Sequence, residues 1–155
     1  MTNQWRQLPA PARPIAAATD AAVAAARAQD NAALTAAVAE LAAQDQAQSG
    51  LILGTTVRVL LELAHPDGLD GDDIRAVLEQ TVRSAAKWAP DVDPHVVLVL
   101  LAGALGVHDD EEPPLKPDAL ALHSTLLIAR LLGPREVKEV LTTALNEIER
   151  TQLND

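Results

Sequence analysis

The amino-acid sequence predicts an all-α fold, a compact bundle of six or seven helices. Hydrophobic residues make up 48% of the 155 residues, a share that is typical of a globular domain with its own core. The chain lacks Phe, Tyr and Cys and is very rich in Ala, the residue with the highest intrinsic helix propensity. In most segments the apolar residues recur at spacings of three and four, which is the period of an α-helix.

Residues 1–18 are predicted to form an extended leader, and residues 19–155 the single helical domain. Three prolines alternate with Ala and Arg in the leader, and this composition favours a polyproline-like conformation. Trp5 stands out in the leader. It either folds back over a hydrophobic groove of its own chain or docks on a partner.

Two alanine-rich helices are expected at the start of the domain. Thr19 or Asp20 caps the first, which runs to about residue 29. Asp30 or Asn31 caps the second, which runs to about residue 46. Such side chains are favoured there because their oxygens accept hydrogen bonds from the free N–H groups of a helix start.

A polar linker and a third helix follow. Residues 44–50 are polar and contain no β-forming residues, which predicts a linker. Residues 51–64 are apolar around most of the helix circumference, so this helix is expected to be largely buried with one wet edge. That edge is formed by Thr55, Arg58, Glu62 and His65.

The fourth helix, residues 71–89, is the clearest amphipathic segment. Its inward positions are Ile74, Val77, Leu78, Thr81, Val82, Ala85 and Trp88. The aspartates around its start resemble a calcium loop only superficially, because the twelfth position from Asp67 is Leu78 and not a bidentate Glu. Asp70 is instead predicted to cap the helix.

Three more helices complete the predicted bundle. Asp93 followed by Pro94 is a favoured helix start. Residues 96–107 are apolar on every side, which predicts that this fifth helix is the central, fully buried element. The sixth and seventh helices are expected at residues 117–132 and 135–152.

A repeat links the two halves of the domain. Residues 73–82 and 136–145 match in residue class position by position, and Ile74 and Val137 are 63 residues apart, as are the caps Asp30 and Asp93. Helices two to four would then correspond to helices five to seven, as two pseudo-repeated three-helix units. Convergent patterning in a chain rich in Leu, Val and Ala explains the match equally well.

Charge and composition disfavour several classes of function. The net charge is −10, from 22 acidic and 12 basic residues, and the scattered bases disfavour nucleic acid and anionic lipid as partners. A basic protein partner fits better, and so does solubility alone. The longest apolar run has 12 residues, against about 20 needed to cross a membrane, and no signal peptide is visible. We expect a cytoplasmic protein.

Few residues are candidates for a site. Asp109, Asp110, Glu111 and Glu112 form an acidic loop, which we interpret as solvated or as a contact for a basic partner. His123 lies seven residues before Arg130 on a similar helix face, and the two form either a polar patch in a groove or the wet edge of a packed helix. No nucleophile elbow or phosphate loop is present, so we expect no cofactor, no metal and no catalytic residue.

The sequence therefore favours a non-catalytic protein-interaction or regulatory module that uses Trp5 and the acidic loop. The alternative is a small-molecule pocket or an enzyme built around His123 and Arg130. Self-association as a homodimer is a third use for an exposed apolar stripe.

Overall fold

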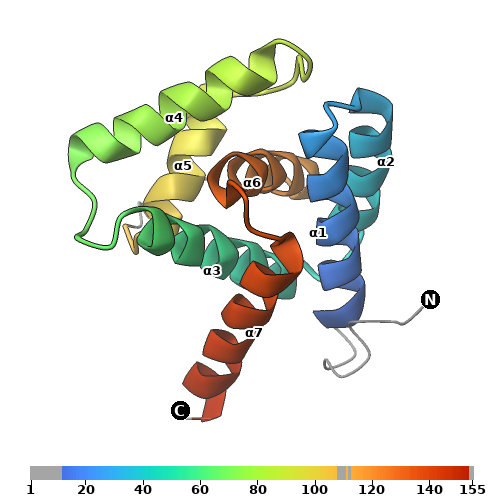
Figure 1. The fold of residues 1–155 in the computed structure, drawn as a ribbon. Helices are drawn as coiled ribbons and strands as arrows, with labels where there is room; N and C mark the ends of the chain where they lie inside the picture. Colours follow the sequence, from blue (N-terminus) through green and yellow to red (C-terminus); the bar gives the residue numbers. More distant parts are fainter. Residues whose placement is uncertain (1–11, 108–110, 112, 154–155) are drawn as a thin grey trace.

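The computed structural model describes residues 12–107, 111 and 113–153. Within them the chain forms seven helices and no strand, which confirms the predicted all-α fold (Figure 1). The helices are α1 (Ala12–Arg27), α2 (Asn31–Ala42), α3 (Gln46–Ala64), α4 (Gly71–Ala86), α5 (Pro94–Ala104), α6 (Pro117–Leu132) and α7 (Val137–Leu153). None of the described helices has the length and apolar character that crossing a bilayer requires.

Helix α6 is the centre of the bundle. It packs against α1, α2, α3, α4 and α5, and Figure 1 shows it between the α1–α2 pair and the α4–α5 pair. Leu127, Ile128 and Leu132 on α6 are fully buried. Helix α7 packs mainly along α3, and its C-terminal end projects from the body of the molecule (Figure 1).

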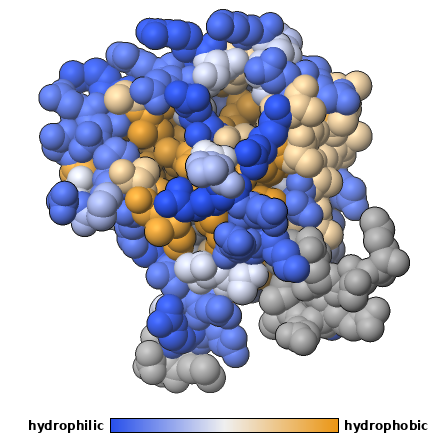
Figure 2. Space-filling model, viewed as in Figure 1, coloured by the Kyte–Doolittle hydropathy of each residue, from blue (hydrophilic) through white to orange (hydrophobic). Residues whose placement is uncertain are grey.

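The prediction that residues 96–107 form the central helix is wrong. Val97 and Leu101 are fully buried, but Leu98 is 44% exposed and Val107 is 64% exposed. Apolar character alone does not bury a residue, because folded proteins leave much apolar surface in contact with water. Figure 2 shows apolar surface gathered around α5 and α6, with hydrophilic residues over α4 and the lower part of α7.

Aspartate caps set the helix starts. Asp30, Asp70 and Asp93 accept hydrogen bonds from backbone N–H groups in the next turn, and these predicted caps are confirmed. Asp70 and Asp73 form a reciprocal capping box, which accounts for these two carboxylates without a bound ion. The predicted linker at residues 44–50 is wrong, because Asp45 caps α3 and the helix begins at Gln46.

The predicted extended leader is also wrong from residue 12 onward. Helix α1 begins at Ala12, and Ile15 and Ala16 are completely buried. Pro14 is compatible with this start, because the N–H it lacks is one of those that have no partner within a helix. Trp5 and the rest of residues 1–11 lie outside the described residues.

The packing of the two predicted three-helix units is partly symmetric. Helix α2 packs on α6 as α5 packs on α3, and α7 packs on α3 as α4 packs on α6. Thr56 and Thr125 hold equivalent places, each fully buried with its hydroxyl 2.7 Å from the carbonyl oxygen four residues earlier. The symmetry is incomplete, because α5 also packs on α4 and α6 whereas α2 makes little contact with α7 or α3. A common origin of the two units stays a prediction.

Candidate functional site

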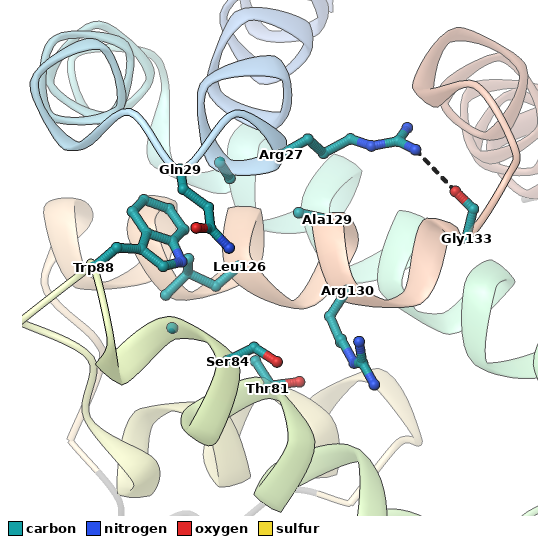
Figure 3. A pocket seen from close by; sticks show the side chains of 11 residues that line it. Arg27, Gln29, Thr81, Ser84, Trp88, Leu126, Ala129, Arg130 and Gly133 are labelled. Carbon is teal, nitrogen blue, oxygen red and sulfur yellow. Dashed lines mark hydrogen bonds between the residues drawn. The ribbon is translucent and has the colours of Figure 1, made fainter.

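A cleft of about 350 Å³ opens where the C-terminal end of α1, the last turns of α4 and the C-terminal half of α6 meet (Figure 3). We call it the arginine cleft. Its polar lining residues are Arg27, Gln29, Thr81, Ser84 and Arg130, and its apolar ones are Ala26, Ala85, Trp88, Leu126 and Ala129, with Gly133 at the edge.

Gln29 reaches the cleft through an uncommon backbone conformation. Its φ is 56°, and it is the one described residue other than glycine with a positive φ. The Gln29 N–H donates to the Ala26 carbonyl and the Asp30 N–H to the Ala25 carbonyl, which is the Schellman pattern that ends α1. Glycine is the usual residue at this position, because a side chain there costs about 1 kcal/mol or more. Gln29 therefore carries a local conformational strain at the rim of the cleft.

Trp88 forms the wall at the same end of the cleft as Gln29 (Figure 3). It follows the last turn of α4, where its N–H donates to the Ala85 carbonyl, and its own carbonyl accepts a hydrogen bond of 3.0 Å from the Asn31 side chain. These bonds tie the tryptophan to the start of α2. The indole is half-buried, and its N–H donates to none of the described residues.

The two arginines of the cleft differ in what they bind. The Arg27 guanidinium donates to the carbonyl of Gly133 at 2.9 Å and to that of Arg135 at 3.3 Å, which fixes the turn between α6 and α7. Among the described residues, Arg130 donates only to the neutral side chain of Gln80, at 3.2 Å.

The arginine cleft is a locally positive place on a strongly acidic chain. In the described part of the chain, no carboxylate oxygen lies within 4.0 Å of either guanidinium. Nor is there a carboxylate among the described residues that line the cleft, although the chain has 22 acidic residues and a net charge of −10.

Thr81 contributes a buried hydroxyl that has no hydrogen-bond partner among the described residues. The residue is 2% exposed, and its Oγ1 neither donates nor accepts within the described structure. The other buried threonines, Thr19, Thr56 and Thr125, each donate to a carbonyl one turn earlier. An unsatisfied buried hydroxyl costs about 1–3 kcal/mol, so Thr81 marks a position that is not optimised for stability.

His123 does not lie in the arginine cleft. It is 3% exposed at the side of a separate cleft of about 400 Å³ between α2 and α6. Its Nε2 accepts a hydrogen bond of 2.9 Å from the Asp93 N–H, so the proton of the neutral ring is on Nδ1, which donates to the Ala119 carbonyl at 2.8 Å. Both ring nitrogens are occupied, and neither is left to bind a ligand or to act as a base.

The predicted pairing of His123 with Arg130 is therefore wrong, because the two side chains line different clefts. The alternative of a wet edge is wrong for His123, since Ser124 and Thr125 are buried with it. Arg130 itself is exposed and lines the arginine cleft.

The remaining predicted contacts fall largely outside the described structure. Trp5, Asp109, Asp110 and Glu112 lie there, whereas Glu111 is described and exposed. No three His, Asp or Glu side chains among the described residues come together as metal ligands would. The sequence missed Gln29, Ser84 and Thr81 as site residues. One signal in the sequence could have indicated the site: Thr81 places a hydroxyl on the inward face of an amphipathic helix.

Comparison with known proteins returns no family model, no curated protein and no solved structure that matches this chain.

Proposed function

We propose that this protein is a non-catalytic binding module with a regulatory role, and that the arginine cleft is its binding site. One observation carries the proposal: a guanidinium without a carboxylate partner and a buried hydroxyl without a hydrogen-bond partner line the same cleft. A buried hydroxyl without a partner is rare in folded proteins, and an anionic ligand would give this hydroxyl an acceptor and the exposed guanidinium a counter-charge.

The chemistry of the lining supports binding rather than reaction. A general acid or base must gain or lose a proton, and a guanidinium does not give up its proton in proteins. The hydroxyls of Thr81 and Ser84 would need an adjacent base to act as nucleophiles. Among the described lining residues there is no His, Lys, Asp or Glu to serve as one.

Trp88 provides the test of this proposal. The chain has two tryptophans, so a Trp5→Phe variant leaves Trp88 as its only indole. We would titrate this variant with benzamide, benzoate and cyclohexanecarboxylate and follow Trp88 fluorescence together with the indole N–H resonance of Trp88 and the resonances of His123. Saturable changes at Trp88 with at least one of these compounds are expected. Changes confined to His123 and its neighbours, or none with any compound, would refute the proposal.

A second candidate function is contact with another protein through α5. Leu98 on this helix and Val107 just beyond it are large exposed apolar residues, and Figure 2 shows apolar surface gathered around α5. The net charge of −10 makes a basic protein the favoured partner, with a second copy of this chain as the alternative. We propose a cytoplasmic location with it, because a chain without cysteine has no disulfide that needs an oxidising compartment.

Sedimentation or light scattering over a wide concentration range tests the self-association form of this candidate. A dimer that Leu98→Lys converts to monomer would support it. Leu63→Lys on α3 is the matched control, since Leu63 is 46% exposed and Leu98 is 44% exposed. A strict monomer at high concentration would eliminate self-association.

A further inference from the structure

We propose that the ligand of the arginine cleft is a small monocarboxylic acid with a flat or apolar body. Its carboxylate would lie between Arg130 and the hydroxyls of α4, and its body against Trp88. The inference rests on the proposed function and adds to it the chemical class of the ligand.

The charge of the cleft favours a single negative charge. Arg27 donates to the carbonyls of Gly133 and Arg135 in the turn that follows α6. The donors of Arg27 are therefore directed at the backbone, whereas Arg130 bonds the side chain of Gln80 and is the cation that a ligand can reach beside the hydroxyls of α4. A carboxylate matches the fork of one guanidinium, and the net charge of −10 repels a dianionic phosphate more strongly than a monoanion.

The hydrogen-bonding groups point the same way. Figure 3 shows the hydroxyl oxygens of Thr81 and Ser84 on α4 turned toward the Arg130 end of the cleft. An ionised carboxylate only accepts hydrogen bonds, and this end of the cleft offers it donors from a guanidinium and two hydroxyls. Thr81 Oγ1, which has no partner in the described structure, would gain an acceptor.

The other end of the cleft suits an apolar or aromatic body. Trp88 presents its ring there, and Leu126 with the alanines of α1, α4 and α6 completes the apolar lining. A volume of about 350 Å³ is at the small end of the range for ligand sites, which is roughly 300–1,000 Å³. The space therefore fits one ring or a branched chain with a short acidic arm.

The test compares an acid with its neutral amide. In the Trp5→Phe background we would measure the Kd of 3-phenylpropionate and of 3-phenylpropanamide from Trp88 fluorescence. We expect the acid to bind at least tenfold more tightly. Arg130→Gln should abolish this preference, and Arg83→Gln should keep it, because Arg83 is an exposed arginine on the outer face of α4 and its loss changes the net charge equally. Arg130 is itself exposed, so its replacement leaves the core intact.

Each other outcome counts against a defined part of the account. Equal affinity for acid and amide, or an acid preference that survives Arg130→Gln, would overturn the carboxylate assignment and leave the cleft as a binding site. Tighter binding of phenyl phosphate would overturn the preference for a monoanion. A peptide with a free C-terminal Phe that binds tenfold more tightly than 3-phenylpropionate would replace the small acid with a protein terminus. No change at Trp88 with any probe would overturn the proposed function as well.

Discussion

The two halves of α6 treat their polar groups in opposite ways. In the N-terminal half, His123 is buried and each of its ring nitrogens has a backbone partner. In the C-terminal half, Arg130 has only a neutral partner, and Thr81 on the facing wall has none in the described structure. A polar group whose hydrogen bonds are all made within the folded chain has none left for a ligand. One that is left unsatisfied is available to a ligand, and this difference places the candidate site at the C-terminal end of α6.

Replacement of His123 should change the stability of the protein more than any other substitution proposed below. His123→Leu leaves the Asp93 N–H, at the start of α5, without its acceptor. We expect a loss of about 2 kcal/mol in the free energy of unfolding, because the substitution removes two part-buried hydrogen bonds of the His123 ring, and urea denaturation measures it. His123→Gln, which keeps an acceptor, should lose less. Affinity for 3-phenylpropionate should stay unchanged, and a tenfold loss of affinity would make His123 part of the site.

The substitution Thr81→Val tests whether the buried hydroxyl contributes to ligand binding. The substitution removes an unsatisfied hydroxyl and nearly keeps the shape, so the ligand-free protein should gain about 1–2 kcal/mol of stability. Binding of 3-phenylpropionate should weaken several-fold. Ser49→Ala is the matched control, because Ser49 Oγ is also buried without a partner but Ser49 is not among the residues that line the cleft. A Thr81→Val protein that binds as tightly as the parent would show that the hydroxyl is irrelevant to the ligand.

The substitution Gln29→Gly should also raise stability and weaken binding, but by smaller amounts. Glycine adopts the positive φ of this position freely, so we expect a gain of about 1 kcal/mol in stability. The same change removes the amide from the rim of the cleft and should weaken binding. Thermal unfolding and the Trp88 titration measure the two effects, and a loss of stability would contradict the account of strain.

The smallest change in stability is expected when an arginine with carboxylate partners, Arg58, is replaced and compared with Arg130. Arg58 on α3 bonds Glu62 at 2.8 Å and Glu147 of α7 at 2.7 Å. Burial opposes its charged form, but hydrogen bonds and attraction from the two glutamates outweigh burial and raise the pKa of Arg58. A raised pKa stabilises the fold at every pH below the unfolded value, so this contribution is lost only in strong alkali.

Because the Arg58 side chain is 37% exposed, solvent screening limits its contribution, and Arg58→Gln should cost only about 0.5 kcal/mol at neutral pH. Arg130→Gln should leave stability unchanged in urea denaturation. Equal losses from the two variants would mean that Arg130 has a structural role.

The helices were predictable because their signals are local. Aspartate caps, prolines and apolar spacing lie within a few residues of what they determine, and Asp30, Asp70 and Asp93 were identified from them. Which helix is central depends on the whole arrangement. The histidine and hydroxyl side chains of α6 concealed its burial, since His123 and Thr125 are satisfied by backbone groups of the fold.

The candidate site was predictable only in part. Arg130 was identified, but seven residues separate it from His123, which is about 10 Å along a helix, and the two open on different clefts. Sequence spacing gives the helix face and not what packs between two residues. Whether the Thr81 hydroxyl finds a hydrogen-bond partner depends on residues of other helices, and no local sequence pattern encodes that arrangement.

Nuclear magnetic resonance can follow both halves of α6 in a single titration. In the ¹⁵N-labelled Trp5→Phe protein, titration with 3-phenylpropionate should shift the Trp88 indole N–H and the Arg130 side-chain N–H signals along one saturable curve. The His123 ring N–H, held by the Ala119 carbonyl in the other half of α6, should not move. Shifts at His123 with the Trp88 and Arg130 signals unchanged would contradict a binding site at the C-terminal end of α6.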